Sequence, residues 1–76
     1  MEGAFKMPES LYKVIELVGS SEKSWADALE NVVKEAAKTL RDLRIAEIVQ
    51  QDVKIDDQKI ALWRVRVRLS FKYEGS

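Results

Sequence analysis

The chain contains no cysteine and no histidine among its 76 residues. Without cysteine no disulfide forms, and without both residue types a tetrahedral zinc site lacks its usual ligands. The same absences exclude Ser-His-Asp and Cys-His catalysis and the usual ligation of haem and iron–sulfur clusters. A chain this short buries only about 60% of its unfolded surface. Oligomerisation is therefore the remaining common way to stabilise it, with an idealised monomer as the alternative.

Long apolar runs and a net charge are absent too. No run of about 18 apolar residues exists, so nothing predicts a membrane-spanning helix or a secretory signal. The 13 basic and 13 acidic residues cancel, which argues against a dedicated nucleic-acid or membrane binder. We therefore expect a soluble, cytoplasmic protein of one domain. The charge is uneven, because residues 60–76 hold four basic side chains and one acidic side chain.

The chain has a single proline, Pro8, and it lies in a segment without hydrophobic periodicity. Residues 1–10 are therefore predicted to form a mobile N-terminal arm, and residues 11–76 to form the folded domain. Phe5 and Met7 are the apolar residues with which the arm could dock on that domain.

A strand and a helix are predicted after the arm. Residues 12–19 are rich in β-branched and aromatic residues and predict a strand that ends at Gly19. Apolar residues then recur at helical spacing across residues 25–40, with Ser20 or Ser21 as the predicted N-cap. The helix should therefore be about 19 residues long and amphipathic.

Two further strands, residues 45–55 and 60–73, are joined by a polar turn at residues 56–59 and predict an antiparallel hairpin. A helical crossover leaves its two flanking strands parallel, so the last strand fits between them and runs opposite to both. The predicted fold class is α+β: a β-α-β-β chain whose three-stranded antiparallel sheet, in the order 1-3-2, packs on one helix.

The lengths of these elements predict a homo-oligomer. A helix of about 19 residues spans about 28 Å, whereas a strand of about 14 residues spans about 46 Å. One helix cannot cover such a sheet, so part of its apolar face would remain in water, and exposed apolar area of this kind marks an interface. The second strand would also present an open edge.

A stripe of three arginines, Arg64, Arg66 and Arg68, is the most distinctive feature of the last strand. One interpretation is a solvated or subunit-facing surface, where the arginines pair with acids such as Glu47 or Glu16. A second interpretation is a site for an anionic small ligand. A third is nucleic-acid binding, which lacks a second basic element or an aromatic platform here, so no nucleic-acid partner is expected.

The other candidate residues predict packing more than chemistry. Trp25 and Trp63 are expected to anchor the core or an interface, with ligand stacking as the alternative for Trp63. Asp52, Asp56 and Asp57 lie near the hairpin turn without the glycine and the final glutamate of a calcium loop. No carboxylate pair is placed for acid–base catalysis, so an enzyme is not expected. Interface contacts or ion pairs are predicted for Arg64, Arg66, Glu47 and Trp63.

Four segments in this order resemble the dodecin family: Lys13–Ser21, Ala36–Leu40, Ala46–Val49 and Val65–Phe71. The resemblance covers residues 12–74. It implies a homododecamer built as a hollow shell that binds and stores flavins, FMN or riboflavin, without catalytic turnover.

The resemblance also implies where a flavin would bind. The position of the family's flavin-stacking tryptophan is held by Ile45, and that of a glutamine that contacts the ring's polar edge is held by Arg68; Arg44 and Gln50 would line the site. Because both signature residues are changed, the resemblance implies weak or absent flavin binding. The chain is similar to a tryptophan-lacking subgroup that includes calcium dodecins, so a structural or calcium-binding assembly is the alternative.

Overall fold

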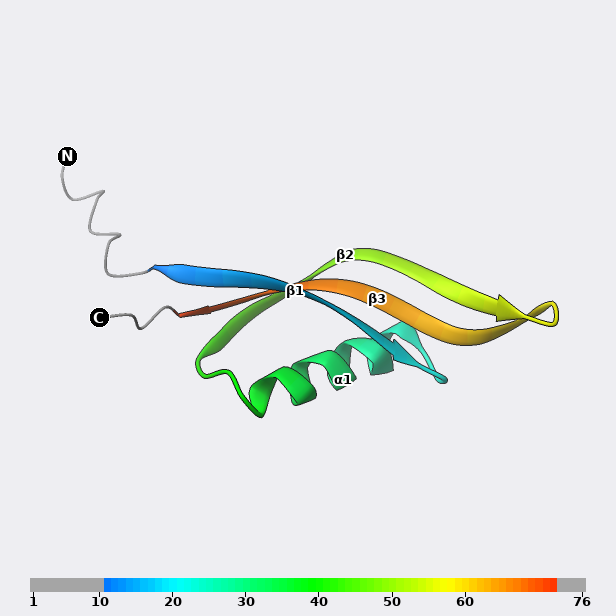
Figure 1. Cartoon of the computed structure of the whole chain (residues 1–76), viewed down its shortest axis with the longest axis horizontal. Coiled ribbons are helices and arrows are strands. Elements are labelled where there is room, and N and C mark those ends of the chain that lie inside the picture. The colour runs from blue at the N-terminus through cyan, green and yellow to red at the C-terminus, as the bar shows by residue number, and fades with distance from the viewer. Residues whose placement is uncertain (1–10, 73–76) are drawn as a thin grey trace.

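A computed structural model describes residues 11–72. Four elements follow one another: β1 (Tyr12–Ser21), α1 (Trp25–Ala37), β2 (Leu43–Asp56) and β3 (Lys59–Lys72). They form one antiparallel sheet in the order β1-β3-β2, with α1 across one face (Figure 1). The predicted fold class and strand order are therefore confirmed. The predicted mobile arm, residues 1–10, lies outside the described residues.

The helix begins later than predicted. Its N-cap is Ser24, whose hydroxyl accepts a hydrogen bond from the backbone N–H of Asp27 at 3.0 Å. Ser20 and Ser21 instead belong to β1, so the prediction of either as the cap was wrong. The Ser21 hydroxyl accepts from the backbone N–H of Lys23 at 2.8 Å and donates to the Asp27 carboxylate at 2.7 Å. These bonds order the turn between strand and helix.

The helix also ends earlier than predicted, at Ala37, and its 13 residues span about 20 Å. The N–H groups of Thr39 and Leu40 both bond to the carbonyl of Ala36, at 3.1 and 2.9 Å, which tightens the last turn. Asp42 then adopts a φ of 57°, in the left-handed region, and the chain reverses into β2. The helix is thus even shorter relative to β3 than the sequence indicated.

The core lies between α1 and β3. Its buried residues are Ala28, Val32, Ala36, Val65, Val67 and Leu69. β1 continues past Gly19, where the sequence predicted its end, and the glycine has a packing role instead. A Cβ at Gly19 would overlap Cγ2 of Val32, so the missing side chain lets the helix approach the strand closely.

The β2–β3 hairpin turns through two residues, Asp57 and Gln58, with φ values of 54° and 65°. Two consecutive left-handed residues make the tight turn that matches the twist of antiparallel strands. The hairpin is confirmed, with a shorter turn than the four residues predicted. In Figure 1 it extends well beyond the helix.

The described part of the chain is elongated, 58 × 27 × 14 Å, with a radius of gyration of 16.1 Å. A compact domain of this length would have a radius of gyration of about 11 Å. Large apolar side chains are exposed on the sheet, including Ile45 at 65% and Ile55 at 64%. This shape agrees with the expectation that one protomer does not cover its own apolar surface. Within residues 11–72 no helix is long and apolar enough to span a membrane.

Candidate functional site

Alternation along β3 gives the sheet two unlike faces. Val65, Val67 and Leu69 lie against α1 and are at most 1% exposed. The residues between them point away from the helix, because side chains alternate along a strand. This second side is the open face. It comprises Val14, Glu16, Val18 and Ser20 of β1, Arg64, Arg66, Arg68 and Ser70 of β3, and Ile45, Glu47, Gln50 and Asp52 of β2.

Two arginines of the open face pair with acids on the neighbouring strands. Arg68 lies opposite both Glu16 and Glu47, with nitrogen–oxygen distances of 3.6 and 3.8 Å. Arg64 donates to both oxygens of the Asp52 carboxylate, from Nε at 2.7 Å and from Nη2 at 2.9 Å. The predicted pairing of the stripe with Glu47 and Glu16 is therefore confirmed for Arg68.

Arg66, between these two, has a different setting. The register places Val18 on one side of it and Gln50 on the other, and neither carries a charge. Among residues 11–72, Arg66 makes no ion pair and no side-chain hydrogen bond. The middle arginine of the stripe thus keeps its donors available.

Sequence reasoning missed the pair between Asp52 and Arg64, because a bulge creates it. A regular hairpin that starts with Asp56 opposite Lys59 would place Asp52 opposite Trp63, on the helix-covered face. A register shift near the turn moves the pairing by one residue and brings Asp52 opposite Arg64. No pattern in the sequence marks the position of that bulge.

The electrostatics of the pair follow from its geometry. The hydrogen bond from Arg64 is the largest cause that lowers the pKa of Asp52 below its ordinary value. Partial desolvation opposes this, and the charges of Arg64 and Arg66 lower the pKa further. The same hydrogen bond raises the pKa of Arg64. Both groups are therefore held in their charged forms.

The residues predicted to line a flavin site are brought together in part. Ile45 lies opposite Ser70 and is therefore a diagonal neighbour of Arg68 on the open face. Gln50 lies further along the same face. Arg44 is exposed and falls at a register shift, where it has no partner in the β2–β3 register.

Trp63 lies on the helix-covered side, not on the open face. Its ring meets that of Trp25 edge to face, with centroids 4.9 Å apart and planes at 88°. The indole N–H of Trp25 donates to the backbone carbonyl of Asp52 at 3.0 Å. The predicted packing role is confirmed, and the pair ties α1 to β2 and β3. Contacts with a second subunit stay a prediction for Arg64, Arg66, Glu47 and Trp63.

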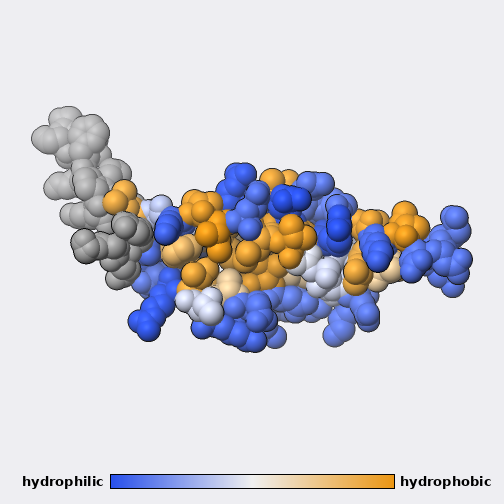
Figure 2. Space-filling view, viewed as in Figure 1, coloured by the Kyte–Doolittle hydropathy of each residue, from blue (hydrophilic) through white to orange (hydrophobic). Residues whose placement is uncertain are grey.

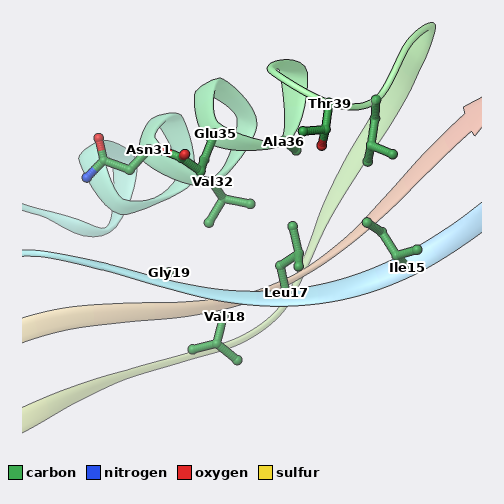
Figure 3. Close-up of a pocket in the computed structure, with 10 residues that line it drawn as sticks. Ile15, Leu17, Val18, Gly19, Asn31, Val32, Glu35, Ala36 and Thr39 are labelled. Carbon is green, nitrogen blue, oxygen red and sulfur yellow. The ribbon is translucent and has the colours of Figure 1, made fainter.

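A groove of about 520 Å³ runs between α1 and β1. Figure 3 shows Leu17 on the strand and Val32 on the helix pointing toward each other, while Val18 points to the opposite side of the strand. In Figure 2 apolar side chains form a continuous area between the strands and the hydrophilic outer surface of the helix. The groove is therefore an apolar surface, with Asn31 and Glu35 at its polar rim.

A metal site is not formed by one protomer over the described range. Within residues 11–72, no group of three or more acidic side chains is placed to hold a metal ion. The carboxylates of the open face are separated by arginines instead. The cluster of acidic side chains that a calcium site would need is therefore not found among residues 11–72 of one protomer.

Comparisons with known proteins match most of the chain. The Dodecin family model matches residues 11–74. The calcium dodecin of Mycobacterium tuberculosis is 35% identical over 63 residues, which are 83% of this chain and 89% of that protein.

Solved structures agree with the sequence matches. The dodecin of Streptomyces coelicolor superposes with a TM-score of 0.87 at 37% identity, covering 92% of this chain and all of that one. The structure of the M. tuberculosis protein, described as a calcium-chelating antigen with a novel calcium-binding site, gives 0.77 at 34% identity, covering 88% and 96% of the two chains. The dodecin of Streptomyces davaonensis gives 0.82 at 29% identity, covering 87% and 97%.

Proposed function

The chain belongs to the dodecin family, and from that premise we propose that it is a self-assembling, non-catalytic protein that holds a flavin against its open face. Storage of the ligand, rather than its conversion, is the role proposed. Action in the cytoplasm is part of the same proposal and is tested by cell fractionation.

The observation that carries the proposal is the exposure of apolar side chains on the open face. Val14, Val18 and Ile45 are 53%, 55% and 65% exposed in a single protomer. Soluble proteins rarely leave such a surface in water, and it is usually covered by a partner or a ligand. Apolar surface beside a few convergent polar groups is also the usual composition of a small-molecule site.

Assembly supplies the enclosure that one protomer lacks. The elongated shape and the open edge of β2 both favour association with further copies of the chain. We propose the dodecamer of the family. Native mass spectrometry tests it: a mass of twelve chains supports the proposal, and a monomer or dimer at micromolar concentration contradicts it.

Flavin binding is proposed around Ile45 and Arg68. Ile45 offers apolar contact but no aromatic ring, so the affinity should be modest. Substitution Ile45→Trp should restore stacking and tighten riboflavin binding by about 2- to 10-fold per contact. Riboflavin fluorescence quenching measures the affinity. The matched control is Ile55→Trp, which changes an equally exposed isoleucine at the far end of β2.

Arg68→Gln is the second change of the same test. Combined with Ile45→Trp, it reproduces both of the family's flavin contacts at the positions assigned here. We expect the double variant to bind riboflavin more tightly than either single variant. If it assembles as the parent does and its affinity is unchanged, the assignment of the site to these two positions is wrong.

Calcium binding is a second candidate, favoured by the similarity to the calcium dodecin of M. tuberculosis. One protomer shows no carboxylate cluster within residues 11–72, and we propose that a second chain supplies part of the ligands. Calcium at 100 times its dissociation constant would stabilise the assembly by about 2.7 kcal/mol. Melting in millimolar calcium, compared with magnesium and with a chelator, tests this candidate. An unchanged melting temperature excludes it.

A further inference from the structure

We infer that Arg66 is a phosphate-binding site for the ligand held on the open face, and that it gives this chain a preference for phosphorylated over unphosphorylated ligands. The inference rests on the proposed flavin binding for the identity of the ligand. It concerns a different residue from those that the resemblance assigned.

The three arginines of the stripe differ in what neutralises them. Arg64 gives two hydrogen bonds to Asp52 and thereby occupies both carboxylate oxygens. Arg68 lies between two carboxylates, those of Glu16 and Glu47, so the charge around it is net negative. A phosphate would be repelled at Arg68 and would have to displace a bidentate carboxylate at Arg64.

Arg66 has neither obstacle. Its neighbours in the register are Val18 and Gln50, and no acid lies directly opposite it on β1 or β2. Asp52 is close enough for the charges to interact, but both of its oxygens already accept from Arg64. A guanidinium with its donors available is the side chain best suited to a phosphate, because its planar fork offers parallel N–H groups.

The surroundings of Arg66 suit an organic phosphate in particular. The amide of Gln50 offers further donors beside the guanidinium. Val18, which is 55% exposed, offers apolar surface on the other side. A small hollow of about 20 Å³ is lined by Val18, Gln50, Asp52, Arg64, Val65 and Arg66, and it has room for an atom of a bound group. Ile45 and Arg68 lie further along the same face.

The test compares riboflavin with FMN, which differ by one phosphate, on the full-length assembled protein. We expect FMN to bind about tenfold more tightly than riboflavin, and Arg66→Gln to abolish the difference while riboflavin affinity stays the same. The matched control is Lys59→Gln, which also removes one positive charge from β3 but at an exposed position beside the hairpin turn, outside the hollow. It should keep the preference for FMN.

Three results would overturn the inference. In the first, Arg66→Gln keeps the preference for FMN. In the second, Arg66→Gln weakens the binding of riboflavin as much as that of FMN, which would show that the arginine does not contact the phosphate. In the third, native mass spectrometry shows that the variant assembles into fewer subunits than the parent, which assigns Arg66 to a subunit contact.

Inorganic phosphate separates this inference from the flavin proposal. If the parent protein binds neither flavin, the flavin proposal fails, and calorimetric titration with inorganic phosphate then decides the role of Arg66. If inorganic phosphate binds to the parent but not to the Arg66→Gln variant, the result supports a phosphate site that serves another ligand. No binding to the parent, or equal binding to both proteins, overturns it.

Discussion

The two faces of β3 are built from the same fourteen residues, yet different forces organise them. On the covered face, Val65, Val67 and Leu69 are buried against the helix, and their contribution is hydrophobic. On the open face, arginines that remain about half exposed meet acids from both neighbouring strands. The comparison teaches that burial organises the covered face, whereas the open face combines exposed ion pairs with apolar side chains that one protomer leaves uncovered.

The largest loss of stability is expected from a substitution on the covered face. Leu69→Ala removes a side chain that is 1% exposed and should lower the free energy of unfolding by about 2–5 kcal/mol. The control is Ser70→Ala, the next residue along, which lies on the open face and should change stability by less than about 0.5 kcal/mol. Urea denaturation measures both. Equal losses would show that the two faces contribute alike.

A smaller loss of stability is expected when a side chain is added where the helix and β1 approach each other closely. Gly19→Ala places a methyl group against Val32 and should destabilise the protein by about 1–3 kcal/mol. Val32→Ala removes the obstructing atom, so the double variant should lose less than the sum of the two single losses. A double-mutant cycle by thermal melting measures this coupling. Strict additivity would mean that the contact is not the reason for the glycine.

The ion pairs of the open face should contribute less to the free energy of unfolding than the buried residues of the covered face. Replacing Glu16 and Glu47 together by glutamine removes both partners of Arg68 and should cost about 0.2–1 kcal/mol per pair. The loss should shrink further at high salt, because exposed charges are screened. Chemical denaturation at two salt concentrations measures this. A loss as large as that of Leu69→Ala would contradict the contrast between the faces.

The smallest effect is a dependence on pH through Asp52. Its pKa is lower in the folded state than in the unfolded chain, so the pair with Arg64 stabilises the fold above the unfolded pKa. This contribution is lost as the pH falls through the folded value. The stability difference between the parent and Asp52→Asn should therefore narrow below about pH 4. A difference that stays constant down to pH 2 would exclude this linkage.

Much of the fold could be predicted, because hydrophobic periodicity records which side of an element is buried. The alternation of residues 60–73 identified Val65, Val67 and Leu69 correctly as one face. The order of elements then left one simple antiparallel topology. Family membership could also be predicted from the sequence, because it depends on short segments in a fixed order.

The boundaries and the site could not be predicted to the same degree. Three serines precede the helix, and only the backbone geometry selects Ser24 as the cap over Ser20 and Ser21. The pair between Asp52 and Arg64 depends on a bulge that shifts the register by one residue. For the same reason, the distinct setting of Arg66 could not be predicted. It depends on the register that places Val18 and Gln50, rather than acids, opposite this arginine.

The contact between Trp25 and Trp63 gives the protein an intrinsic fluorescence probe at one defined place. Both tryptophans of the chain stand in this one pair, so their ultraviolet emission comes from a single place. That place joins the helix to the hairpin through the indole N–H bonded at Asp52, whose carboxylate holds Arg64 on the opposite face. A spectrometer without any added dye can therefore follow whether helix and hairpin stay docked while the open face is titrated.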